Sequence, residues 1–233
     1  MSEDSELRAP SKEDVLFASN RTLWRMDAIL DYRSGNDYTY RQGYRRAGRI
    51  LTEHIAEGRG EVDFLVFPIC HAYRHFVELS LKRLMLLAAQ LAGRELTPAE
   101  KKLQGGTHKL QQLWEAFKLI NQEAETSTGI APPPPEHLDG IEAYIAQLHQ
   151  ADTDSMSFRY PLAKDGTAHL EGMQRINLGQ FSDCLEALCN YLDGWDSYFG
   201  DMIQTKAEMY AEAYDDMHTD RMNEAEFYGD IEY

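Results

Sequence analysis

Apolar residues recur at helical spacing along almost the whole chain, and turn residues separate the periodic segments. We therefore expect an all-α protein, a helical bundle of six to seven helices with one long packed loop and an acidic C-terminal tail. The predicted helices cover residues 13–33, about 37–58, about 61–92, a short segment from 98, about 107–124, 136–150, and about 177–205.

Residues 67–89 carry a polar pattern that is unusual for a helix. Five polar side chains fall within one stripe about 100° wide, and most other positions are apolar or small; the five are His71, Arg74, His75, Glu78 and Lys82. Arg83 is the exception. A helix that is apolar around most of its circumference is usually buried, so we expect the stripe to face a cleft, a partner chain or an internal polar network.

The pattern also sets the domain boundaries. Residues 1–12 are polar and predicted to be a flexible N-terminus, residues 13–205 form the bundle, and residues 206–233 form an acidic aromatic tail. Residues 152–176 are the one long irregular stretch, and their apolar side chains favour a packed loop or a small hairpin that turns at Asp165-Gly166.

Charge is distributed unevenly. The formal charge of −16 argues against general electrostatic binding to nucleic acid or to anionic membranes. Residues 21–49 nevertheless carry seven Arg against three Asp, whereas residues 201–233 carry ten acids against two bases. The row Arg41, Arg45 and Arg49 is a possible RNA contact, but an exposed arginine row is more often a solvated surface or a contact for acidic residues. We predict that the tail docks on this row, and the tail is also a possible site for a protein partner.

Cysteine content and hydropathy indicate the cellular compartment. Three scattered cysteines suit reduced thiols better than a disulfide framework or a zinc motif. The N-terminus lacks a secretion-signal pattern, and no apolar run is long enough to span a bilayer. We expect a cytoplasmic protein without membrane contact.

The stripe permits three kinds of site. As a metal site, His71, His75 and Glu78 would supply ligands from one helix face, with His108 as a fourth ligand. Arg74 argues against this alternative, because a permanently charged guanidinium raises the cost of placing a divalent cation beside it. We therefore expect no metal and no cofactor.

As an anion site, Arg74, Lys82 and Arg159 would hold a phosphate while His75 or His71 moves a proton, as RNA hydrolysis or transesterification requires. As a structural site, Arg74 and Glu78 would form an internal ion pair that Arg159 and the histidines extend into a buried network. In both cases we predict that Arg74, Glu78 and Arg159 lie in one network.

Three short motifs carry a family resemblance: YRHFVELSLKRL at residues 73–84, THKLQQLW at 107–114 and SMSFRYP at 155–161. Together they resemble bacterial all-helical proteins of the HEPN superfamily, over roughly residues 61–192. The resemblance implies a bundle that often dimerises and a role in phage defence or stress, frequently as a ribonuclease. The usual nuclease signature of that family is Arg, four to six residues, then His, which this chain offers only as Arg49 and His54.

The residues that we expect to carry any chemistry are Arg74, His75, Glu78, His108 and Arg159. The leading hypothesis is a HEPN-like homodimer that acts on or binds RNA, as a metal-independent ribonuclease of phage defence or stress response. The alternative is a non-catalytic dimeric interaction module of a defence or toxin–antitoxin system.

Overall fold

The computed structural model describes residues 9–30 and 37–229, without the side chains of residues 216 and 219–229. The chain divides into two compact units, residues 1–36 and 37–233. Most of the predicted flexible segment 1–12, and the last four residues of the tail, lie outside the described residues.

The helix predicted for residues 13–33 is wrong over its described part. Residues 9–30 contain only one 3₁₀ turn, η1 (Trp24–Met26). Their large apolar side chains are all exposed, so no tertiary packing supports a helix whose isolated formation is marginal in water. The apolar residues do recur at helical spacing, but this spacing alone does not form a helix when the apolar side chains are not buried.

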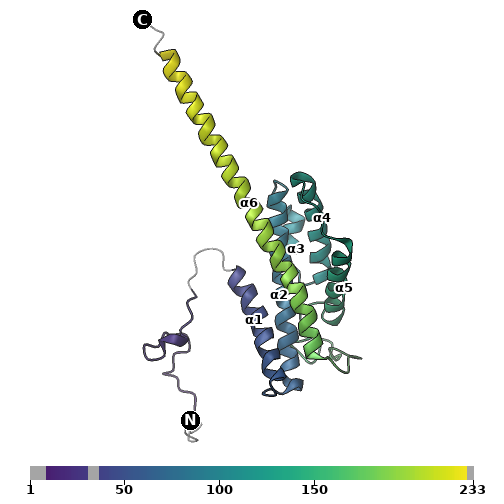
Figure 1. Ribbon diagram of the computed structural model, residues 1–233. Coiled ribbons are helices and arrows are strands. Elements are labelled where there is room, and N and C mark those ends of the chain that lie inside the picture. The colour runs from purple at the N-terminus through teal and green to yellow at the C-terminus, as the bar shows by residue number, and fades with distance from the viewer. Residues whose placement is uncertain (1–8, 31–36, 230–233) are drawn as a thin grey trace. The chain divides into compact units, whose positions relative to one another are not determined.

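The second unit is all-α, as predicted. Its helices are α1 (Asp37–Ala56), α2 (Val62–Leu91), α3 (Pro98–Gly106), α4 (Leu110–Thr128), α5 (Pro135–Ala151) and α6 (Leu178–Gly229). Helix α2 lies at the centre and packs against α1, α4 and α6 (Figure 1). Of these six helices, none is both long enough and apolar enough to cross a membrane.

The core forms around α2 because that helix is apolar on several sides. Its fully buried side chains include Ile69, Phe76, Leu81 and Leu84. Between α4 and α6, Trp114 and Phe117 of α4 pack against Trp195 of α6, with ring centroids 5.2–6.2 Å apart. Burial of large side chains by three neighbouring helices stabilises α2, which contains Pro68 in its second turn.

Helices α1 and α2 approach each other closely at Gly48. A Cβ atom at this position would lie 2.8 Å from the ring of Tyr73, closer than packed carbon atoms can approach. The Tyr73 hydroxyl in turn bonds Ser182 and Glu186 of α6, at 2.9 Å each. One aromatic residue therefore joins three helices, and the contact requires a glycine opposite it.

Residues 152–176 form the predicted packed loop. Phe158 and Ser155 are buried, and a small hairpin is closed by an antiparallel bridge between Leu162 and Ala168. Gly166 adopts a φ of +86°, which places the turn where the sequence predicted it.

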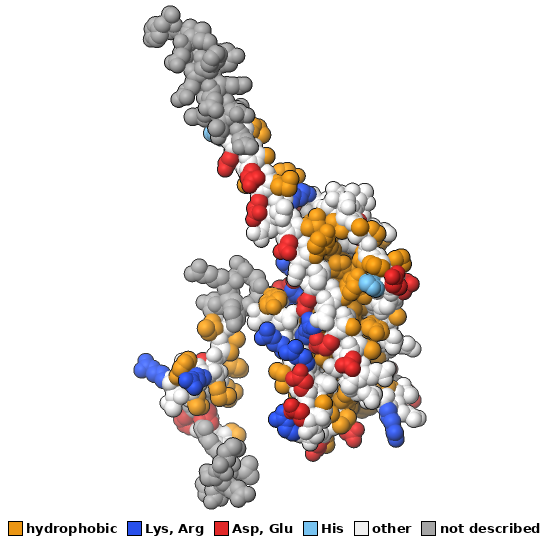
Figure 2. Space-filling model, in the orientation of Figure 1, with side chains coloured by type: hydrophobic (Ala, Val, Ile, Leu, Met, Phe, Trp, Pro, Cys, Tyr) orange, Lys and Arg blue, Asp and Glu red, His pale blue; other side chains and the backbone are white. Residues whose placement is uncertain are grey.

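Helix α6 differs from the expectation at its C-terminal end. We predicted that helical structure would fade near residue 205, yet the helix continues to Gly229 and extends beyond the bundle (Figure 1). The segment KAEMYAEAY is rich in Ala, Glu, Met and Lys, which have high helix propensity. Figure 2 shows apolar (orange) and acidic (red) side chains on the stretch of α6 that directly leaves the bundle.

Candidate functional site

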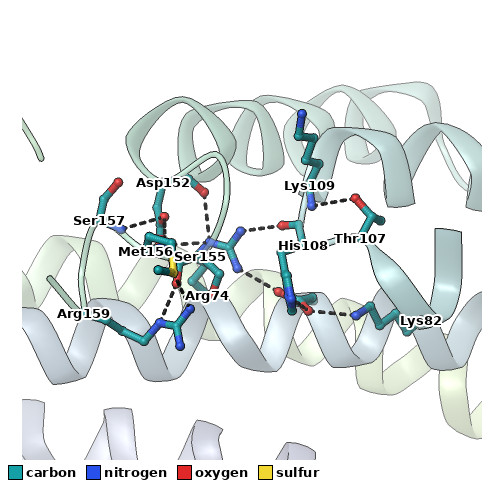
Figure 3. A network of polar contacts seen from close by, with 11 residues as sticks. Arg74, Lys82, Thr107, His108, Lys109, Asp152, Ser155, Met156, Ser157 and Arg159 are labelled. Atoms are coloured by element: carbon teal, nitrogen blue, oxygen red, sulfur yellow. Dashed lines mark hydrogen bonds and ion pairs between the residues drawn. The ribbon is translucent and has the colours of Figure 1, made fainter. Parts of the chain in front are cut away.

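Arg74 is the centre of the polar stripe and is completely buried. Its Nη1 donates to Glu78 Oε2 at 2.9 Å, and its Nη2 donates to the backbone carbonyl of His108 at 2.6 Å (Figure 3). Its Nε donates to the backbone carbonyl of Asp152 at 3.1 Å and lies 3.3 Å from the carboxylate of the same residue. The predicted Arg74–Glu78 pair is therefore present, and it also fixes two backbone segments.

Asp152 is a member of the network that the sequence analysis missed. It is fully buried at the C-terminal end of α5. Its Oδ1 accepts hydrogen bonds from the backbone N–H groups of Met156 and Ser157 at 2.7 and 2.9 Å. A single Asp after a predicted helix does not by itself indicate a buried position in a network. The available signal was that a buried arginine needs more than one acceptor.

Glu78 connects the buried arginine to more exposed groups. Its Oε1 accepts from Lys82 Nζ at 2.9 Å and lies 2.8 Å from His108 Nδ1. Burial alone would raise the pKa of Glu78, but the bonds from Lys82, His108 and Arg74 outweigh it and lower the pKa below its ordinary value. The carboxylate is thus held in its charged form.

Arg159 does not join this network, so that part of the prediction is wrong. Its Nε donates to the carbonyl of Ser155 at 2.6 Å, its Nη2 contacts Met156 Sδ at 2.9 Å, and the residue is exposed. Figure 3 shows it beside Ser155 and Met156, with its guanidinium separate from that of Arg74. The physical reason is that Arg74, Lys82 and His108 already engage the Glu78 carboxylate, so a further guanidinium is not needed to neutralise it.

His71 and His75 lie on the side of the stripe that faces α1. Their rings stack with centroids 5.6 Å apart, and Tyr44 packs edge-on against His75 at 4.4 Å. Burial lowers the pKa of both imidazoles; Arg159 and Arg74 lower that of His71 further, and His71, Arg74 and Lys82 that of His75. Glu78 opposes the shift at both histidines, but both favour the neutral form.

The metal alternative does not match this arrangement. Glu78 is engaged by Arg74, Lys82 and His108, whereas His71 and His75 stack on each other. In the described part of the chain, no cluster of three or more His, Cys, Asp or Glu side chains is arranged to hold a metal ion.

His108 is the accessible member of the network. Its side chain is 56% exposed, while the Glu78 carboxylate that contacts its Nδ1 is only 1% exposed. A buried carboxylate therefore fixes one ring nitrogen and leaves the other, Nε2, on an exposed ring. This carboxylate–imidazole pair can accept and return a proton without moving.

The arginine row on α1 is not the open surface that an RNA track would need. Arg41 is 1% exposed and pairs with Asp193 and Asp196 of α6 at 3.4 and 2.7 Å. Arg45 pairs with Glu186 and Asp193 at 2.5 and 2.7 Å. Arg49 is exposed and lies 3.6 Å from Glu53.

Acidic residues do contact Arg41 and Arg45, as one of the two interpretations held, but these acids precede the predicted tail. The prediction that the tail masks the row is therefore wrong for Arg41 and Arg45, and the described part of residues 206–229 continues α6 beyond the bundle (Figure 1). The partners come from the bundle half of α6, because the two helices pack side by side and their charged edges meet.

Comparison with known proteins adds no assignment, since no family, no curated protein and no solved structure matches this chain. The resemblance to HEPN proteins stays a prediction.

Proposed function

We propose that this protein cleaves RNA phosphodiester bonds without a metal, using His108 as the proton acceptor. The observation that carries the proposal is the 2.8 Å contact between His108 Nδ1 and the buried Glu78 carboxylate, with the rest of the ring exposed. A carboxylate that orients an imidazole and stabilises its protonated form is a recurring arrangement in acid–base catalysis.

The proposed step is a transesterification. His108 Nε2 takes the proton of a ribose 2′-hydroxyl, and the 2′-oxygen attacks the adjacent phosphorus. The bond from phosphorus to the 5′-oxygen of the next nucleotide breaks, and this oxygen takes a proton from solvent. Lys82, whose Nζ lies 2.9 Å from Glu78, supplies positive charge close to the same histidine.

The geometry favours His108 over the histidines that the stripe suggested first. His71 and His75 have buried Nδ1 atoms for which the described residues provide no hydrogen-bond partner, and neither contacts a carboxylate that would stabilise the protonated ring. Arg74 and Glu78 are too buried to touch a substrate. In this proposal they are positioning residues, and Arg159 has no assigned part.

The test is cleavage of labelled single-stranded RNA in the presence of a chelator, with the matching DNA as a substrate that lacks the 2′-hydroxyl. General acid–base catalysis contributes about 10²–10⁴-fold, so His108→Ala should lower the rate at least a hundredfold. The fold should persist, because Arg74 bonds the backbone carbonyl of His108 and not its ring. His137→Ala, at an exposed histidine on α5, is the matched control.

Three results would contradict the proposal: no cleavage by the wild-type chain, cleavage that the chelator removes, or equal rates for wild type and His108→Ala. If His108→Ala lost its cleavage activity only because the variant unfolds at the assay temperature, the role of His108 would be structural, and this result would also contradict the proposal.

The second candidate is a non-catalytic dimeric module. It is favoured by the exposed apolar side chains at the start of α2, where Phe64 is 72% and Phe67 45% exposed one turn apart. Under this alternative Phe64→Ser should abolish association of the purified chain, and the RNA assay should show no cleavage by any variant.

A further inference from the structure

Beyond the bundle, α6 carries an apolar face that is exposed over its described side chains, which extend to residue 218. In the first half of α6, Leu188, Leu192, Trp195 and Phe199 are buried in the core. The same face continues beyond the bundle, because positions three and four residues apart lie above one another on a helix. It carries four large apolar side chains that are between 59% and 67% exposed: Met209, Tyr210, Tyr214 and Met217. We call these four residues the α6 stripe.

Acidic residues lie on the other side of this helix. At 100° per residue, Asp201, Glu208 and Glu212 fall opposite the α6 stripe. Lys206 falls within the stripe and is the one Lys or Arg among the described side chains beyond residue 200. A partner that covers the stripe therefore meets apolar and aromatic side chains and one lysine, and it does not meet the acidic face.

We infer that the α6 stripe pairs with the α6 stripe of a second copy of this chain, in antiparallel orientation. Two copies that meet through their stripes keep both acidic faces outward, so the negative charge of this region does not oppose association. An isolated helix is marginally stable in water, and burial of Met and Tyr against a second helix supplies the missing stabilisation. The inference is independent of the proposed RNA cleavage.

The lysine fixes the orientation. A parallel pair in register would place Lys206 beside Lys206 of the second copy and bring like charges together in an apolar seam. In an antiparallel pair centred on the stripe, Tyr210 lies opposite Tyr214 of the second copy. The two Lys206 positions are then twelve residues apart along the axis, or about 18 Å at ~1.5 Å per residue.

The first experiment is sedimentation of the full chain over a wide range of protein concentrations. We expect a wild-type dimer and a monomeric Tyr210→Glu/Met217→Glu variant with unchanged near-ultraviolet circular dichroism. Thr205→Glu/Ala211→Glu adds the same charge off the stripe and should remain dimeric. A wild-type chain that is monomeric at every concentration, or a dimer that survives the stripe substitutions, would overturn the inference.

The second experiment tests the orientation by oxidation of Met217→Cys in a Cys184→Ser background, which keeps Lys206 in place. In the antiparallel pair the two 217 positions are ten residues apart along the axis, or about 15 Å at ~1.5 Å per residue, whereas in the parallel pair they face each other. Cys70 and Cys189 are buried, so the new thiol is the accessible one. A disulfide needs Cα atoms within about 7 Å, so the antiparallel dimer should not be cross-linked. An interchain disulfide at this position would overturn the antiparallel arrangement.

Discussion

Two ion-pair networks connect the helices of this bundle, and they differ in how far their charged groups are exposed to solvent. In the α2 network, Arg74, Glu78 and Asp152 are each no more than 1% exposed. In the α1–α6 seam, Arg41 is equally buried, but its partners Asp193 and Asp196 are 25% and 19% exposed. Water can replace a lost partner in the seam and cannot do so beside Arg74.

The seam also contains alternative partners. Asp193 is shared by Arg41 and Arg45, and Asp196 is shared by Arg41 and Arg83. In the α2 network Glu78 is shared in the same way, by Arg74, Lys82 and His108. The comparison therefore indicates that similar arginine–carboxylate pairs should differ in their effect on the free energy of unfolding mainly according to solvent access.

The largest expected effect is that of Glu78→Ala. It leaves Arg74 buried with one carboxylate fewer, and removal of one partner of a buried pair typically costs about 3–5 kcal/mol. Chemical denaturation measures this loss. Arg159→Ala, which removes an exposed arginine from the neighbouring loop, should change the free energy of unfolding by less than about 0.5 kcal/mol. Equal losses in the two variants would refute the placement of Arg159 outside the network.

An intermediate effect is expected for Arg41→Ala in the seam. Its hydrogen bonds to partly exposed carboxylates are worth about 1.5–3 kcal/mol, and Arg45 and Arg83 remain to neutralise the acids. Arg49→Ala on the same helix removes only a surface pair and is the control. If Arg41→Ala destabilised the protein more than Glu78→Ala in the same denaturation series, solvent access would not be the deciding factor.

The smallest expected effect is the pH dependence of stability that His71 and His75 cause. The folded state lowers the pKa of His71 and His75 below the unfolded value of about 6.5, so the unfolded chain binds more protons just below that pH. Stability is therefore full above pH ~6.5 and is lost as the pH falls. The slope is at most about 1.4 kcal/mol per pH unit for each histidine.

The measurement is denaturation of wild type and His71→Asn/His75→Asn between about pH 7 and pH 5.5, a range in which Glu78 stays charged. The variant should show a shallower pH dependence. A residual slope should remain, because burial also lowers the pKa of His149. Parallel curves for the two proteins would show that these imidazoles are not held neutral.

Much of the bundle could be predicted because the apolar pattern of α2 indicates that this helix is buried. A helix that is apolar on most sides must be central, and its polar residues must find partners inside. Arg74 and Glu78 followed from that reasoning. Asp152 did not, because its role depends on a tertiary contact between the end of α5 and α2, and nothing in its local sequence distinguishes it from a surface aspartate.

The two chain ends were mispredicted for opposite reasons. Residues 13–30 have a helical apolar period but bury none of their large apolar side chains, so the period alone was insufficient. Residues 206–229 have an acidic composition that suggested a tail, but 13 of these 24 residues are Ala, Glu, Met, Lys or Arg, which have high helix propensity. Composition reports solubility and charge, whereas helix formation depends on propensity and on a buried face.

Gly48 also determines how α1 can be aligned on α2. If α1 were shifted by one residue, Ala47 or Arg49 would take the place opposite the Tyr73 ring, and the backbones would have to separate. Only the observed alignment lets the helices close and also sets Arg41 and Arg45 opposite the acids of α6. The absence of a side chain at one position thus selects one pairing of helices from several that the apolar pattern alone would permit.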